Sequence, residues 1–171
     1  MPLFNPTIGP LIVADEASSL AANAAATYTA NGVYLYAFEL QAATTFSGGK
    51  WRCGATTTGT TDVGIYSFAG NLQGTDTGAV TNVASTNISA NFTGGNITLP
   101  PGQYFAALCV SNGTDTIAGK QGGISTTEVA SRQRFATNSA TSGVLPSTTG
   151  GYSDAPVNFP SFALTVVNGL T

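Results

Sequence analysis

Residues 33–40 of the chain read VYLYAFEL, and residues 104–110 read YFAALCV. Both stretches are rich in aromatic and aliphatic residues and are apolar at almost every position, without alternation of apolar and polar residues. A β-strand that is buried on both faces has this pattern, whereas a strand with one face in water alternates with a period of two. The two stretches therefore predict strands that lie in the interior of the protein.

Further short strands are expected around these two segments, separated by turns that contain Gly, Pro and Asn, such as Pro100-Pro101-Gly102. About eight short strands with almost no helix predict an all-β single domain over residues 28–171, a β-sandwich or jelly roll. The expected strands besides the two above are Thr44–Cys53 with a bulge or bend at Gly48-Gly49, Thr61–Phe68, Ala79–Ala84, Thr86–Phe92, Ile97–Leu99, Thr116–Ala118 and Phe159–Val167.

Residues 1–27 are expected to form an N-terminal arm. Pro2, Pro6 and Pro10 prevent a regular helix and block ladder hydrogen bonds, so the first part should be extended. The Ala-rich segment Asp15–Ala26 is a candidate for one short helix. The arm is too apolar to stay in water, and it docks either on its own sandwich or on a neighbouring protein. In the second case the assembly anchor consists of Leu3, Phe4, Ile8, Leu11, Ile12 and Val13.

The composition favours a protein that assembles with other subunits. Charged residues make up 8% of the chain and apolar residues 42%, so the polar surface must consist mainly of neutral side chains. Such a surface resists self-association poorly, and we expect an oligomer. The net charge of −3 includes no basic stripe for nucleic acid, and no segment is suited to membrane insertion. The N-terminus also lacks the features of a signal peptide.

A search for catalytic chemistry finds little. The chain contains no histidine, which removes the usual general base and the commonest metal ligand. We expect no catalytic residues, no cofactor and no metal. The only alternatives are a carboxylate pair formed by Glu39 and Asp62 across a sheet, and a calcium site at a turn with Asn112 and Asp115. Cys53 and Cys109 are expected to be buried free thiols, although a disulfide between neighbouring strands is an alternative.

A carbohydrate-binding surface is the remaining candidate. The segment Lys120–Tyr152 is long, irregular and rich in Gly, Ser and Thr, as functional or interface loops often are. Arg132, Arg134 and Tyr152 in this segment are candidate ligand contacts. Trp51 and Phe159 are further aromatic residues on which a sugar ring could stack, but the position of Trp51 beside a bulge signal favours a place in the core.

Two motifs resemble those of a known group of proteins. Asp62–Asn71 (DVGIYSFAGN) is similar to a "VGIY-xx-xG" strand and turn in β-sandwich virion proteins of tailed bacteriophages, and Leu99–Leu108 (LPPGQYFAAL) to their "LPPGxYxxAL" turn and strand. Tyr34–Leu40 also fits, and the resemblance covers about residues 28–118.

The resemblance implies a subunit on a virion surface: a capsid decoration (cement) protein, a fibre knob or a tail-fibre tip that recognises host glycan. Such proteins are commonly homotrimers, bind capsid or tail proteins, and have no catalytic residues to carry over. The protein would be made in the host cytoplasm. The absence of a coiled-coil or repetitive shaft departs from long tail fibres and favours a small protein docked directly on the particle.

Overall fold

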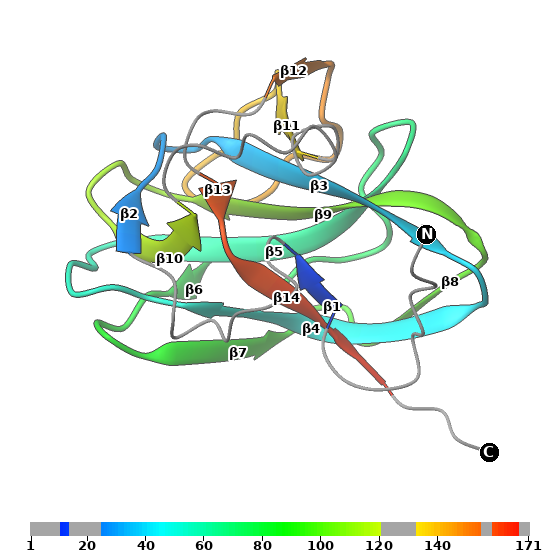
Figure 1. Ribbon diagram of the computed structural model, residues 1–171, viewed down its shortest axis with the longest axis horizontal. Helices are drawn as coiled ribbons and strands as arrows, with labels where there is room; N and C mark the ends of the chain where they lie inside the picture. The colour runs from blue at the N-terminus through cyan, green and yellow to red at the C-terminus, as the bar shows by residue number, and fades with distance from the viewer. Residues whose placement is uncertain (1–10, 14–24, 121–132, 155–158, 168–171) are drawn as a thin grey trace.

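The protein is a β-sandwich in the computed structural model, which describes residues 11–13, 25–120, 133–154 and 159–167. The larger layer is a six-stranded sheet in the order β12-β11-β3-β9-β5-β6, and neighbouring strands in it are antiparallel (Figure 1). Its strands are β3 (Val33–Leu40), β5 (Thr60–Ser67), β6 (Val80–Thr81), β9 (Gly102–Val110), β11 (Gln133–Ala136) and β12 (Tyr152–Asp154).

The second layer is a five-stranded sheet in the order β1-β14-β4-β7, with β8 pairing with the first part of β4. These strands are β1 (Leu11–Val13), β4 (Thr44–Arg52), β7 (Asn87–Asn91), β8 (Ile97–Leu99) and β14 (Phe162–Val166). A small sheet of β2 (Ala25–Thr27), β10 (Thr116–Lys120) and β13 (Phe159–Pro160) lies at one end of the sandwich (Figure 1).

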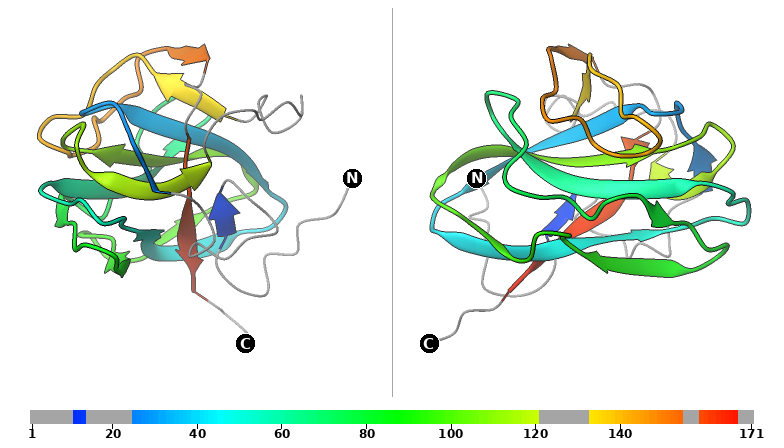
Figure 2. Two further views of the ribbon diagram at one scale, coloured as in Figure 1. Left: turned by 60° about the vertical axis from the view of Figure 1, so that its left-hand side comes forward. Right: turned by 180° about the vertical axis from the view of Figure 1, so that it is seen from behind.

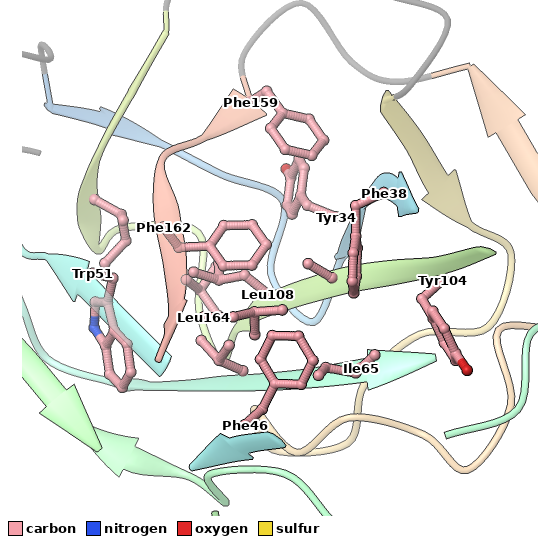
Figure 3. Close-up of a cluster of buried hydrophobic side chains, with 14 of the residues drawn as sticks. Tyr34, Phe38, Phe46, Trp51, Ile65, Tyr104, Leu108, Phe159, Phe162 and Leu164 are labelled. Carbon is pink, nitrogen blue, oxygen red and sulfur yellow. The ribbon is translucent and has the colours of Figure 1, made fainter. Parts of the chain in front are cut away.

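The main core lies between the two layers. Aromatic and aliphatic side chains from β3, β5 and β9 meet those from β4 and β14 in this space (Figure 3). The largest fully buried members of this cluster are Trp51, Tyr34, Phe46, Phe159 and Phe162. The layers approach closely at Gly49, where an added Cβ would lie 2.5 Å from a methyl carbon of Val63. A glycine is therefore required there by packing between the sheets.

The central strands are buried on both faces, as their sequences predict. Tyr34, Phe38 and Leu108 belong to the core between the sheets, whereas the alternate residues Leu35 and Cys109 belong to a second cluster on the outer face of the six-stranded sheet. Further members of the second cluster are Val33, Tyr66, Phe105, Ala107, Ala136, Ala140 and Leu145. The last two come from residues 137–151, the orange segment that curves over the sheet in Figure 2.

The structure confirms the all-β sandwich and changes several local predictions. Ala25 and Ala26, expected in a helix, belong to β2, which pairs with β10 and buries Ala26 in the main core. The rest of the helix candidate, residues 15–24, lies outside the described residues. The strand expected over Ala79–Ala84 is only the two-residue β6. The irregular segment 120–152 contains β11, which adds to β3 and extends the sheet.

The bulge expected at Gly48-Gly49 lies at Ser47, the residue before Gly48. The pairing of β14 with β4 is regular from Phe162 to Thr165, and then Val166 pairs with Phe46 and skips Ser47. Both glycines instead allow close packing. A Cβ at Gly48 would collide with the backbone oxygen of Ala90 in β7, in the same way that one at Gly49 would collide with Val63.

Candidate functional site

The loop of residues 137–151 covers the outer face of the six-stranded sheet. It is anchored to the turn after β5 by backbone hydrogen bonds from Leu72 N to Ser147 O and from Thr149 N to Gly70 O, both 2.9 Å long. Leu145 packs over Gly64, where an added Cβ would lie 2.8 Å from its methyl carbon. The loop therefore explains why β5 is buried on both faces. The exposed aromatic residues considered next lie at the edge of this loop.

Two exposed aromatic rings lie at the edge of this loop, and we call them the ring pair: Phe68 and Tyr152. Phe68 is 53% exposed and Tyr152 40% exposed, although both contact the buried ring of Phe105. The Phe68 and Phe105 rings are stacked with centroids 5.2 Å apart and an interplanar angle of 10°. Tyr152 lies 5.0 Å from Phe105, and its hydroxyl donates a hydrogen bond to the Phe68 carbonyl oxygen at 3.1 Å.

The ring pair is held by a tight turn at the end of β5. Ser67 N donates to Asn71 O at 2.8 Å, and Gly70 N donates to Ser67 O at 2.9 Å. Gly70 has φ of +85°, a left-handed conformation that glycine adopts without strain, and a Cβ there would collide with Thr149. Phe68 is thus fixed from both sides, by its own turn and by the loop of residues 137–151.

Of the three ligand contacts expected from sequence, Arg134 and Tyr152 lie on adjacent strands. Tyr152 pairs with Ala136 in β11, and because side chains alternate, Arg134 lies on the same face of that strand as Ala136. Arg134 is half-buried, however, and its guanidinium donates to the carbonyl oxygen of Gln133 at 2.8 Å. Arg132 lies outside the described residues. The structure therefore pairs Tyr152 with Phe68, which sequence reasoning missed.

Trp51 and Phe159 cannot serve as stacking surfaces, because both side chains are fully buried. The indole nitrogen of Trp51 donates to the side-chain oxygen of Asn82 at 3.2 Å, which satisfies its polar group inside the core. Cys53 and Cys109 are buried free thiols, as expected from sequence. Burial raises the pKa of each thiol, which keeps both in the neutral form.

The carboxylate pair of Glu39 and Asp62, the alternative to a chain without catalytic residues, does not form. Glu39 is exposed and pairs with Gln103 on β9, whereas Asp62 is buried and pairs with Cys109, six residues further along the same strand. The charged group that does act on Asp62 is Asp76, on the loop between β5 and β6.

Asp62 is a fully buried carboxyl that joins three segments. One carboxyl oxygen accepts from the Thr77 hydroxyl at 2.9 Å, and the other accepts from Leu145 N at 2.9 Å. Burial raises the pKa of Asp62 to about 7; the hydrogen bond from Leu145 lowers it, and the charge of Asp76 raises it further. With both oxygens occupied by structural donors, Asp62 holds the covering loop in place.

The calcium candidate is also a structural site. The Asp115 carboxylate accepts hydrogen bonds from Thr58 N at 2.6 Å, Gly59 N at 3.1 Å and the Asn82 amide nitrogen at 2.7 Å. Asn112 turns its carbonyl oxygen to the N–H of Asp115 at 2.8 Å. Burial acts to raise the pKa of Asp115, but these N–H donors outweigh burial and lower it. A carboxylate surrounded by N–H groups has no lone pairs arranged for a cation.

Three residues of the assembly anchor expected from sequence lie on a described strand. Leu11, Ile12 and Val13 form β1, which pairs with β14 at the edge of the five-stranded sheet. The role of these residues as an anchor stays a prediction. Leu3, Phe4 and Ile8 lie outside the described residues.

Within the described ranges, no group of three or more His, Cys, Asp or Glu side chains is placed to hold a metal ion. No helix in the same ranges is long and apolar enough to cross a membrane. Comparison with models of known protein families and with curated proteins finds no match to the chain.

Proposed function

We propose that the chain is a non-enzymatic structural subunit of a bacteriophage virion surface, either a capsid decoration (cement) protein or a fibre-knob subunit. The resemblance of Asp62–Asn71 and Leu99–Leu108 to virion proteins supports this function. Both motifs contribute to adjacent strands of the sandwich, β5 and β9, so they belong to its framework. In this proposal Leu3, Phe4 and Ile8 contact the particle.

The observation that carries the proposal is an edge strand of the five-stranded sheet, β7, which has no charged residue or proline of its own. β7 is an edge strand with the sequence NISAN, and its exposed residues alternate with half-buried ones. Natural proteins guard exposed edges with Lys, Pro, bulges or covering segments, because unpaired backbone groups pair readily with another chain. The sequence of β7 contains no charged residue or proline, and in the described part of the chain the one charged group bound to it is Arg52 of β4, which donates to the Asn87 side chain at 3.1 Å. Such a strand, in a protein with 8% charged residues, supports contact with another subunit. The resemblance favours a homotrimer.

A lysine at this edge tests the assembly proposal. Asn91 is exposed at the end of β7, across from Gly48 of β4. Asn91→Lys places a charge where a neighbouring subunit would dock, and it is expected to shift the protein from oligomer to monomer in light scattering. Gln41→Lys adds the same charge on an exposed residue between β3 and β4 and serves as the control. A wild-type protein that is monomeric at micromolar concentration would contradict the proposal.

The location on the particle separates the two versions of this function. Immunogold labelling of virions with an antibody against the sandwich should mark the capsid if the chain is a decoration protein, and the tail or fibre end if it is a knob. Absence of label on intact virions that demonstrably contain other surface subunits would rule out both.

The second candidate function is that of a tail-fibre domain that recognises a glycan on the host surface. The exposed ring pair favours it, because exposed aromatic rings fixed by buried neighbours are typical of binding surfaces. Fluorescently labelled protein should then bind host cells, and the binding should decrease after removal of surface polysaccharide. A decoration protein gives no such binding.

A further inference from the structure

The Phe68 ring presents one flat face to solvent. Its other face is stacked on Phe105 at an interplanar angle of 10°, and Phe105 itself is only 3% exposed. Since Phe68 remains 53% exposed, its exposed surface includes the ring face opposite Phe105. The Tyr152 hydroxyl donates to the Phe68 carbonyl oxygen, which fixes the backbone at this position. A ligand that covers the ring therefore meets a surface that needs little ordering.

A carboxylate and an amide lie beside these rings on the outer face of the six-stranded sheet. Phe105 belongs to the apolar cluster on this face, and because side chains alternate along a strand, Gln103 in β9 lies on the same face. Glu39 in β3 pairs directly with Gln103. Glu39 is therefore the diagonal neighbour of Phe105, at a separation of about 7–8 Å that long and aromatic side chains span. Both Glu39 and Gln103 are exposed.

The strand order places Glu39 and Phe68 on opposite sides of β9. β9 lies between β3 and β5 in the sheet (Figure 1). Ser67, the last residue of β5, pairs with Tyr104 of β9. Phe68 is the next residue of the chain, and Gln103 is the residue before Tyr104, so both lie at the same end of their strands. A ligand that crosses β9 above Gln103 can therefore contact the Phe68 ring and the Glu39 carboxylate at the same time.

The negative charge of Glu39 is not neutralised by a neighbour in the described part of the chain. Its side chain forms no hydrogen bond or ion pair with any residue there. Arg134 shares the outer face, but it pairs with Leu35, four residues before Glu39 in β3, and its guanidinium donates to the carbonyl oxygen of Gln133. Four residues of a strand span about 13 Å, which exceeds the screening length of about 10 Å at 0.1 M salt.

The patch has the size and the chemistry for one side chain of a partner. Phe68 and Tyr152 are 53% and 40% exposed, which amounts to about 200 Å² together if each ring side chain presents about 200 Å². A stable interface needs about 800 Å² on each partner, so the patch is one anchor point within a larger contact. A planar guanidinium both stacks on aromatic rings and forms forked hydrogen bonds with a carboxylate. Arginine is also enriched among the few residues that dominate binding energy at interfaces.

We propose that the ring pair, Glu39 and Gln103 form a docking site for an arginine side chain of a partner protein. The guanidinium plane lies on the exposed face of the Phe68 ring, and Tyr152 borders it. The guanidinium N–H groups donate to the Glu39 carboxylate and to the side-chain oxygen of Gln103. This inference goes beyond the proposed function, because it names the chemistry of a partner and does not depend on where on a particle the chain lies.

The test uses nuclear magnetic resonance of the full chain with ¹³C-labelled Phe and Tyr. The probe is N-acetyl-L-arginine amide, titrated into the millimolar range at constant ionic strength. The control ligand is N-acetyl-L-citrulline amide, which keeps the shape of the side chain but has no charge. The arginine derivative is expected to shift the Phe68 and Tyr152 ring signals in a saturable way, and the citrulline derivative is not. Added salt should weaken the binding, because it screens the exposed carboxylate.

Substitutions at exposed residues assign the binding to the ring and to the carboxylate. Glu39→Gln removes the charge and keeps the shape, and Phe68→Leu removes the flat π surface, so each should lower the affinity roughly two- to fivefold. Gln103→Glu places a second carboxylate beside the first and should raise the affinity by a similar factor. Asn91→Asp makes the same change of charge on an exposed residue of the other sheet and should leave the affinity unchanged.

Three results would overturn the proposal. The first is equal binding of the citrulline and arginine derivatives, because the site would then not recognise a cation. The second is an unchanged affinity in Glu39→Gln; this residue is exposed, so the variant should fold as wild type does. The third is the absence of any shift with the arginine derivative. If methyl pyranosides shift the ring signals in that case, the ring pair supports glycan recognition and the arginine site is wrong.

Discussion

Replacing Asp62 by Asn is expected to flatten the pH dependence of the stability of this protein. Asp62 is fully buried beneath the loop of residues 137–151, and the pKa of its carboxyl is raised from 3.8 to about 7, first by burial and further by the charge of Asp76. Below about pH 7 the folded protein thus keeps a proton that the unfolded chain releases near pH 4. Stability from this proton is fully present below pH 3.8 and is lost as pH rises through 7.

The size of the effect follows from the pKa difference. A rise of about 3 pKa units corresponds to about 4 kcal/mol between the two limits. Between pH 4.5 and pH 8, the part of this difference that is measured is about 3 kcal/mol. An Asn at position 62 can still accept from Leu145 N and reach the Thr77 hydroxyl, which can donate to Gly78 O instead. The variant should therefore fold and lose this pH dependence.

The measurement is urea unfolding at several pH values and at fixed protein concentration. Trp51 is the single tryptophan of the chain and is fully buried, so its fluorescence reports unfolding of the core. Glu39→Gln removes one exposed carboxylate and is the matched control, which should follow the wild-type pH curve. If the curves of Asp62→Asn and wild type run parallel from pH 4.5 to 8, the buried carboxyl does not hold its proton as argued.

Two further predictions concern packing in the main core. Tyr104 is 7% exposed, and its hydroxyl donates to the Pro100 carbonyl oxygen at 2.9 Å; Tyr104→Ala should reduce the free energy of unfolding by about 3–5 kcal/mol and Tyr104→Phe by only about 1 kcal/mol. A wild-type thermal midpoint in Tyr104→Ala would place this ring outside the core. Gly49→Ala brings a methyl group against Val63 between the sheets and should destabilise by about 1–3 kcal/mol. Adding Val63→Ala should then be less destabilising than the sum of the two single changes, and additive values would contradict the clash.

The two central strands can be predicted because their own residues show the pattern of a strand that is buried on both faces. Val33–Leu40 and Tyr104–Val110 are apolar on both faces because both faces are buried, and the pattern shows this directly. The same reasoning did not identify the cover on the outer face. Leu145 and Ala140 are two apolar residues in a polar loop, and their burial depends on contacts with residues some 80 positions earlier, such as Asp62.

The helix predicted near the N-terminus shows a different limit. Ala25 and Ala26 have high helix propensity, but pairing with β10 and burial of Ala26 outweigh it. Propensity differences of a few tenths of a kcal/mol per residue are smaller than the hydrogen bonds and burial that a sheet edge provides.

The candidate site was only partly predictable. The sequence marks Tyr152 as an aromatic residue in a long polar segment, but it places Phe68 only at the end of a strand. A signal was present, since Ala69-Gly70-Asn71 marks a turn and the residue before a turn is commonly exposed. What no local pattern contains is the stacking of Phe68 on Phe105, because the two lie on different strands.

The position of β14 has a consequence for the order in which the protein is made. β4 pairs with β14 on one side, and β1 reaches the same sheet only through β14. At 5–20 residues per second, a ribosome needs roughly 5–20 s to add the about 110 residues between Arg52 and Phe162. During that time the edge of β4 that will pair with β14 has no partner strand. Several nascent chains on one messenger RNA expose this unpaired edge close to one another. We therefore expect nascent chains to depend on chaperones, and the yield of soluble protein to rise when fewer chains are made at the same time, as under weak induction.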